Sequence, residues 1–303
     1  MARKADIRIG ISGWSYAPWR GKFYPKDLPH KQELQFVGET FRTVEVNGTF
    51  YGSQRPKSFA KWSQAVPDDF VFAIKGPRYI THTRRLKDVG KPLANFFATG
   101  VLQLGAKLGP ILWQFPPNFK FDAQLMEDFL KLLPKDARAA AKLARRHEKG
   151  FGSAAAFKVS ENHAIRHAVE IRHQSFVTPE FIKLLRKHRV ALVCADTVDW
   201  PRLMDVTANF IYCRLHGSEE LYASGYSARA LGNWARRVAD WSQGREPRGG
   251  DRASDSKPRK RATRDVFVYF DNDMKVKAPH DAKVLVEKVG KILKRPIGPE
   301  SGG

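Results

Sequence analysis

Ionisable side chains recur in this chain where a short, apolar, β-rich run comes to an end. Six of them are candidates for chemistry: Glu45, Lys75, Glu170, Arg172, Arg214 and His216. Lysine and arginine suit a phosphate or a carboxylate, and an arginine can grip two oxygens at once. Two glutamates can serve as acid and base if their surroundings push their pKa values apart. We therefore expect a catalytic site that contains Glu45, Lys75, Glu170 and His216.

An anionic ligand is the expectation that follows from the cations, with Arg172 and Arg214 holding it and Lys75 assisting. Burying such charges together with no ligand to serve would carry a heavy desolvation cost. Five residues are possible ligands of a divalent metal: Glu45, Glu170, His173, Asp196 and His216. Because three cations stand near them, a metal is not favoured, and the sequence specifies no cofactor.

Further polar and aromatic residues follow the same runs or lie in the loops after them. The residues expected to contact the ligand are Trp14, Asn47, Tyr51, Arg78, His82, Gln114, Arg172, His173, Asp196, Arg214, Tyr222, Tyr226, Asn272 and Asp273. Their aromatic members could stack on a base or a sugar ring, although large aromatics also anchor loops by packing. Taken alone, Gln114 or Asp196 would more simply be a satisfied partner inside the fold.

These side chains can meet only if the runs that carry them converge. The runs cover residues 7–12, 43–47, 70–75, 110–115, 168–172, 190–196, 210–216 and 266–272. Segments with helical spacing or composition alternate with them, at 31–41, 56–64, 93–108, 123–133, 179–188, 228–241 and 282–293. Eight βα units predict an α/β fold, a single TIM-type (β/α)8 barrel over residues 1–303, whose chemistry sits at the carboxyl ends of the strands.

Two insertions interrupt this alternation. Residues 135–167 are basic and rich in alanine, and part of this segment is expected to be helical. Residues 242–264 are basic and rich in Gly, Pro, Ser and Arg, and they lack the apolar residues that would order them. Their composition predicts a disordered insertion before the last strand.

The charge balance is strongly basic, with 53 Lys and Arg against 31 Asp and Glu and a net charge of +22. Such a field favours phosphates, DNA or RNA, although the excess could also lie in solvated insertions. Both cysteines fall inside apolar runs without a metal-ligand spacing, which predicts buried thiols in a reducing compartment. No apolar stretch approaches the length of a membrane span, so we expect a cytoplasmic protein with no membrane partner. The oligomeric state is left open.

Several of these strings resemble a known family in the right order along nearly the whole chain. They are GISGWSY (10–16), TVEVNGTFY (43–51), FAIKGPRYITH (72–82), QFPP (114–117), EIRH (170–173), RLHG (214–217) and YFDND (269–273). The family is the YecE-like family, domain of unknown function 72. The resemblance implies a barrel similar to those of apurinic endonucleases and sugar isomerases. Asp271 departs from the asparagine usual in the final motif, which puts the chemistry of the last loop in doubt.

Three functions remain open at this point. The first is a nucleic-acid-associated phosphodiesterase or lyase, suggested by the net charge and the aromatic loops. The second is an isomerase-like enzyme acting on a sugar or sugar phosphate. The third is a barrel that binds nucleic acid without catalysis. A basic face continuous with the site would favour the first, whereas charge confined to the insertions would favour the second.

Overall fold

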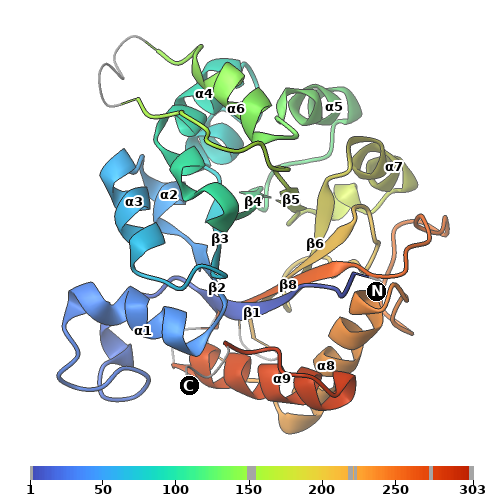
Figure 1. Ribbon diagram of the computed structural model, residues 1–303. Helices are drawn as coiled ribbons and strands as arrows, with labels where there is room; N and C mark the ends of the chain where they lie inside the picture. The colour runs from blue at the N-terminus through green and yellow to red at the C-terminus, as the bar shows by residue number, and fades with distance from the viewer. Residues whose placement is uncertain (1–2, 149–154, 218–220, 222–223, 273–275, 300–303) are drawn as a thin grey trace.

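Eight parallel strands close into a barrel in chain order, as the alternation predicted (Figure 1). The computed structural model describes residues 3–148, 155–217, 221, 224–272 and 276–299. The strands are β1 (Ile7–Ser12), β2 (Thr43–Val46), β3 (Val71–Lys75), β4 (Leu108–Gln114), β5 (His167–Glu170), β6 (Ala191–Asp196), β7 (Phe210–Leu215) and β8 (Asp265–Phe270). Parallel pairing of β8 with β1 completes the ring.

Helices surround the barrel and lie between consecutive strands, except between β6 and β7, where the described residues form no helix (Figure 1). They are α1 (Glu33–Thr40), α2 (Gly48–Tyr51), α3 (Pro56–Gln64), α4 (Gly90–Ala98), α5 (Ala123–Leu132), α6 (Ala137–Ala144), α7 (Pro179–His188), α8 (Ala228–Ser242) and α9 (Lys277–Leu293). The helix expected over 93–108 is broken, because Gly100 takes a φ of 103° and a 3-10 segment follows it. Within the described ranges, no helix has the length and apolarity needed to cross a membrane.

Side chains fill the barrel interior in layers, as alternate residues of each strand point inward. Tyr212 and Arg214 of β7 are two places apart and therefore face the same way, and both are fully buried. Gly10 of β1 is required by close packing, since a Cβ there would lie 2.2 Å from the carbonyl oxygen of Thr43. The apolar layers thus support a polar layer at the carboxyl ends of the strands.

The two insertions contain more structure than their composition indicates. Residues 135–167 include α6, which packs against α4 and is capped by Asp136, whose side chain accepts a hydrogen bond from the amide of Ala139. Residues 242–264 were predicted to be disordered, and this prediction is corrected, because the segment is hydrogen-bonded to the loop between β6 and β7. The carbonyl of Asp251 accepts from the amide of Met204 at 2.8 Å, and Ala253 donates to Asp205 at 2.8 Å. Such hydrogen bonds order the segment in place of apolar contacts, and amino-acid composition does not reveal them.

Candidate active site

A buried guanidinium, that of Arg214, lies at the centre of the polar layer. Its Nη2 lies 2.8 Å from Glu45 Oε1 and 2.7 Å from Asp271 Oδ2, and its Nη1 lies 2.7 Å from Glu170 Oε2. We call these four residues the Arg214 cluster. The side chain of Arg214 is 0% exposed and its donors are directed at carboxylates of its own chain. Arg214 thus holds the cluster together, and its contact with a ligand stays a prediction.

Glu45, on β2, is held by side chains from two other strands, β1 and β7. One oxygen accepts a hydrogen bond from Ser12 Oγ at 2.5 Å, and the other accepts from Tyr212 Oη at 2.5 Å. Asn47 donates in turn to Ser12 Oγ at 3.0 Å. With both oxygens also facing Arg214, Glu45 is positioned to contribute negative charge, and its contacts leave it poorly placed to accept a proton from a ligand.

Glu170 and Asp271 remain ionised although they are buried. Burial alone would raise the pKa of each carboxyl group, but Arg214 outweighs it and holds both pKa values below their usual range. A carboxyl group so strongly held in its charged form is poorly suited to carry a proton, and the role of Glu170 as a general acid or base stays a prediction. In the described part of the chain, no three His, Cys, Asp or Glu side chains are grouped to hold a metal ion.

Lys75 presents its amine to this negative cluster from the end of β3. Among the described residues, no carboxylate oxygen lies within 4.0 Å of its Nζ, which sits 4.4 Å from the centre of the Phe50 ring. The residue is 7% exposed. Burial, followed by the nearby Arg214, lowers the pKa of Lys75 to about 8, even though the three carboxylates act in the opposite direction. Part of the amine is therefore uncharged near neutral pH.

Arg172, Trp200 and His216 form the wall beside the cluster. Arg172 Nε donates to Glu170 at 2.8 Å, and its guanidinium lies 4.0 Å from the centre of the Trp200 ring. That ring meets His216 edge to face at 5.5 Å between centroids. His216 Nδ1 lies 3.1 Å from Asp271 Oδ2, so an imidazole nitrogen stands within reach of a carboxylate.

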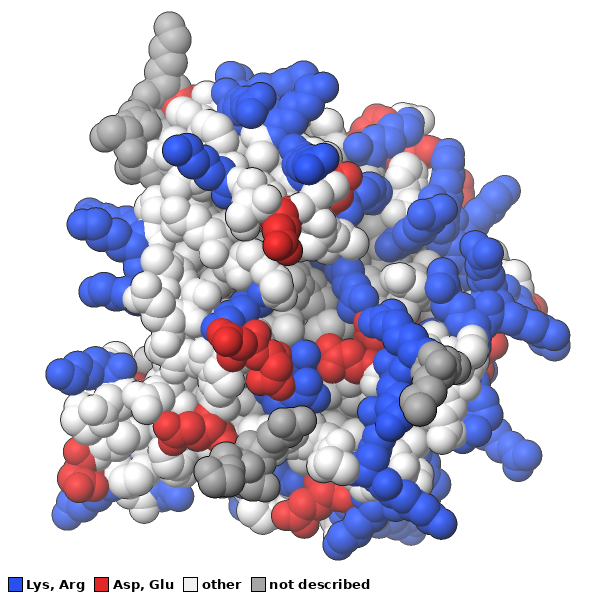
Figure 2. Space-filling model, viewed as in Figure 1, with Lys and Arg blue, Asp and Glu red and all other residues white. Residues whose placement is uncertain are grey.

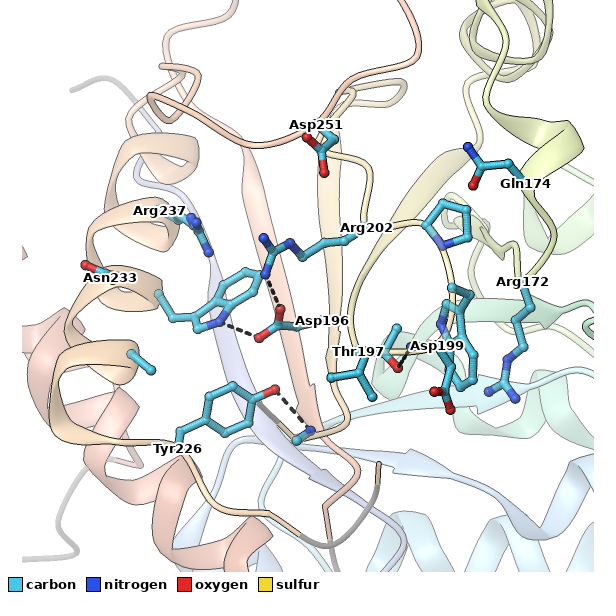
Figure 3. Close-up of a pocket in the computed structure, with 16 residues that line it drawn as sticks. Arg172, Gln174, Asp196, Thr197, Asp199, Arg202, Tyr226, Asn233, Arg237 and Asp251 are labelled. Atoms are coloured by element: carbon cyan, nitrogen blue, oxygen red, sulfur yellow. Dashed lines mark hydrogen bonds and ion pairs between the residues drawn. The ribbon is translucent and has the colours of Figure 1, made fainter. Parts of the chain in front are cut away.

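A cavity of about 680 Å³ is lined in part by Arg172 and Trp200 of this wall (Figure 3). Asn233 and Arg237 of α8 lie on one side of it, and Arg172 and Gln174 lie on the other. Arg237 is half-buried over the ring of Trp234, at 4.8 Å, and no carboxylate of the described residues lies within 4.0 Å of it. The cavity thus offers cations and amides to a polar guest, although the carboxylates of Asp196, Asp199 and Asp251 also line it.

Asp196, at the end of β6, orders the floor of this cavity. It accepts hydrogen bonds from Arg202 at 2.7 Å and from Trp234 Nε1 at 3.0 Å (Figure 3). Tyr226 is buried beside it, and its hydroxyl accepts from the amide of Gly217 at 3.2 Å. Asp196 and Tyr226 were both predicted as ligand contacts; they line the cavity while being partnered within the protein.

The loops after β1, β2 and β3 place their predicted residues at varied depth. Trp14 is half-buried and packs edge to face on Trp62 at 5.4 Å, as an anchor of its loop would. Tyr51 is 71% exposed. Arg78 is exposed and His82 half-buried, and burial together with Arg172 and Arg78 lowers the pKa of His82 to about 4, so this histidine is neutral.

Three other predicted contacts are buried or bonded within the protein. Gln114 is 5% exposed at the end of β4. The side chain of His173 accepts a hydrogen bond from the amide of Ser175 and so caps the 3-10 turn formed by residues 174–176. Asn272 is fully buried and donates to Asp281 at 3.0 Å, so it anchors the last loop. The predicted contacts Tyr222 and Asp273 lie outside the described residues.

Five residues of this region were missing from the expected site: Tyr212, Trp200, Arg202, Arg237 and Asp271. Strand periodicity could have identified Tyr212, two places before Arg214. The sequence marked Asp271 only as a departure from a motif. In the structure it supplies the third carboxylate that pairs with Arg214. Trp200, Arg202 and Arg237 lie in a loop and on a helix face, where spacing gives no signal.

Comparison with known proteins gives a match to one family and to curated relatives. Residues 8–301 match the model of DUF72, a protein family of unknown function. The UPF0759 proteins YunF of Bacillus subtilis and YecE of Escherichia coli K12 are each 28% identical over 37% of this chain, and the match spans 41% and 39% of their lengths.

Two solved structures of DUF72 family proteins share the fold. One, from Thermotoga maritima, has a TM-score of 0.70 and 24% identity and covers 96% of this chain and 100% of its own. The other, from Enterococcus faecalis, has a TM-score of 0.63 and 17% identity, with 97% and 99% coverage. The barrel is therefore common to all three chains.

Proposed function

The chain belongs to the DUF72 family, and we propose that its strand-end site is the active site of an enzyme acting on a small anionic carbonyl compound, such as a sugar phosphate. In this proposal Lys75 is the catalytic amine, and the reaction is a lyase or isomerase step that passes through an imine. The observation that carries it is the buried Lys75 amine, whose pKa is about 8, facing three carboxylates.

The lowered pKa makes an amine available as a nucleophile. At pH 7 about one molecule in ten would hold a neutral Lys75, a few hundred times more than for an ordinary lysine. Neutral Nζ attacks the carbonyl carbon, and the carbonyl oxygen leaves as water after proton transfer. The product is a protonated imine, and the side chains of Glu45, Glu170 and Asp271 stabilise its positive charge.

His216 is the residue that we assign to proton transfer. Its Nδ1 lies 3.1 Å from Asp271 and its Nε2 3.9 Å from Glu170, so either carboxylate can stabilise the protonated ring. Glu45 and Glu170 act as fixed charges. In this assignment Lys75 and His216 keep the catalytic roles expected of them, whereas the two glutamates become positioning and electrostatic residues.

The anionic end of the substrate is assigned to the adjoining cavity. Arg237 and Asn233 face Arg172 across it, and Arg172 also reaches the Arg214 cluster through Glu170. A phosphate held by Arg237 would leave the carbonyl end of a short sugar free to turn toward Lys75. Charge-assisted hydrogen bonds from arginine are the strong contacts that such a ligand needs.

The position of the remaining basic charge favours a small substrate over a nucleic acid at this site. Arg259, Lys260 and Arg261 lie with Arg3 near the start of β8, at the amino end of the barrel. The site lies at the carboxyl end. Buried Cys194 and Cys213 pair across β6 and β7 as free thiols, which suits a reducing cytoplasm, where we place the enzyme.

Borohydride trapping tests this proposal. The protein is incubated with a panel of aldose, ketose and keto-acid phosphates, and in a separate arm with an oligonucleotide that carries an abasic site, and is then reduced with sodium borohydride. We expect a covalent adduct, heavier by the substrate less one oxygen, on Lys75 by peptide mass spectrometry. Its rate of formation should rise with pH as the amine deprotonates through about pH 8.

Matched variants decide the outcome. Lys75→Arg keeps the positive charge but removes the imine-forming amine, so it should form no adduct, while the surface variant Lys283→Arg should behave as the parent. Adducts confined to the abasic oligonucleotide would favour the nucleic-acid lyase instead. Absence of an adduct with every carbonyl compound, or equal trapping in Lys75→Arg, would contradict catalysis by Lys75 and leave a binding protein as the better reading.

A further inference from the structure

A second basic region lies at the amino end of the barrel, away from the strand-end site. Two adjoining cavities of about 380 and 400 Å³ share Asn209, Arg259 and Arg261 in their walls. We call this region the amino-end groove, and its basic residues are Arg3, Arg186, Arg189, Arg259, Lys260 and Arg261. Figure 2 shows Lys and Arg side chains gathering on the right of the molecule, over the orange segment of Figure 1 that precedes β8.

Most of this positive charge is not neutralised within the protein. Among the described residues, no carboxylate oxygen lies within 4.0 Å of the side-chain nitrogens of Arg186, Arg189, Arg259, Lys260 or Arg261. Asp265, the one acidic residue among the described residues of the walls, is bound by Arg3 at 2.8 Å and by Arg166 at 2.6 Å. The groove therefore keeps a net positive field that a polyanion would relieve.

The groove is built into the fold and is more than a solvated loop. Arg186, at the end of α7, donates to the carbonyls of Val206 and Ser256 at 3.1 and 3.0 Å, which holds the inserted segment against the barrel. Arg264, 2% exposed, donates to the carbonyl of Arg259 at 3.1 Å. These bonds use backbone atoms of the basic run and leave its side chains exposed to solvent.

We propose that the amino-end groove is a docking surface for the phosphodiester backbone of a single-stranded nucleic acid. Arginines arranged around a recess match phosphates that follow one another along a strand. The exposed large apolar residues of the described chain, Tyr51, Tyr79, Leu132, Val198 and Ile292, are not in its walls, so it lacks the apolar face with which proteins enter a lipid surface. Binding would be independent of sequence and strongly dependent on salt.

Docking at this end leaves the strand-end site free. The strands that separate the two regions are up to seven residues long, which corresponds to roughly 20 Å of barrel. The same chain would thus hold a nucleic acid at one end while its amine site opens at the other. This surface and the proposed catalysis can be tested separately.

Fluorescence anisotropy with a labelled, mixed-sequence 20-nucleotide single strand, as RNA and as DNA, measures the docking directly. The test variant is Arg259→Ala/Lys260→Ala/Arg261→Ala. Its matched control, Lys142→Ala/Arg145→Ala/Arg146→Ala, removes the same charge from exposed positions in and after α6. We expect the test variant to bind at least about tenfold more weakly and its slope of log affinity against log salt to be smaller by about 2, since three phosphate contacts are lost.

The control should bind within about twofold of the parent, because the bulk of net charge would remain and the groove would be intact. Equal weakening in both triple variants would show that net charge alone drives binding and would overturn the proposal. So would parental affinity in the test variant, or binding to phosphatidylglycerol vesicles with none to the oligonucleotides. Imine trapping on Lys75 in the test variant should match the parent, which separates failure of this surface from failure of the catalytic site.

Discussion

Replacing Arg214 by methionine tests whether the buried ion cluster is a structural unit. The change removes a cation that faces three carboxylates at 2.7 to 2.8 Å, and the side chains of Glu45 and Glu170 are 0% exposed. Taking away one partner of a buried ion pair costs about 3–5 kcal/mol, because the remaining charge stays buried without compensation. With three carboxylates left behind, Arg214→Met should lose about 4–5 kcal/mol of unfolding free energy at neutral pH.

The loss should depend on pH in a direction that the structure fixes. In the parent, Arg214 depresses the pKa of Glu170 and Asp271. The two ionised carboxylates contribute fully to the unfolding free energy at any pH above the pKa values of the unfolded chain, about 4.3 for Glu and 3.9 for Asp. This contribution is lost only as the pH falls below those values. In the variant burial is unopposed by Arg214, so both pKa values rise and the folded state takes up protons at higher pH. Lowering the pH from about 7.5 to about 5 should then stabilise the variant by at least about 1 kcal/mol relative to the parent.

Urea unfolding followed by tryptophan fluorescence at the two pH values measures both quantities. Arg202→Met is the matched control, since Arg202 is 39% exposed and pairs with a single carboxylate, Asp196. Its cost should stay within about 1 kcal/mol and vary little with pH. A loss below about 1.5 kcal/mol for Arg214→Met, or a difference from the parent that does not narrow at the lower pH, would refute the claim that the cluster is desolvated.

Three further predictions concern the scaffold. His167 is buried and neutral: burial lowers its pKa to about 3, and Trp113 donates to its Nδ1 at 3.1 Å. Because this histidine takes up a proton in the unfolded chain below about pH 6.5, the parent loses stability as the pH falls below that value. In urea titrations, the unfolding free energy lost in His167→Gln should therefore be smaller at pH 5 than at pH 7 by about 2 kcal/mol. Gly10→Ala should lower the unfolding free energy by about 1–3 kcal/mol, since its Cβ would meet the Thr43 carbonyl at 2.2 Å; an unchanged midpoint would contradict that packing. Replacing residues 246–262 by a short glycine linker should lower the melting temperature in calorimetry, because the segment is bonded to the barrel, whereas an unchanged Tm would return it to the status of a solvated loop.

Strand order and the converging polar residues could be predicted because both follow from period-two alternation. Glu45, Lys75, Glu170 and Arg214 each close an apolar run, and parallel strands bring such ends together. Which of them serves a ligand could not be predicted from the same pattern. That depends on which charges find partners inside the barrel, and Asp271, which decides the outcome for Arg214, comes from the loop after the last strand.

The inserted segment shows the opposite limit. Residues 242–264 are poor in apolar residues, and composition alone predicts disorder. Order there comes from individual hydrogen bonds such as those of Asp205 and Arg186 to its backbone. These two contacts join residues that are 48 and 70 positions apart in the sequence, and such distant pairs leave no signal in local composition.

The Arg214 cluster also bears on how the two halves of the barrel come together. Glu45 belongs to the half built from β1 to β4, whereas Glu170, Arg214 and Asp271 come from β5 onward. The half from β5 onward carries Arg214 with two of its three carboxylate partners, and the half from β1 to β4 supplies the third, Glu45. Ring closure therefore completes the cluster, and a version of this chain split between β4 and β5 would have to bring Glu45 back to Arg214 to restore it.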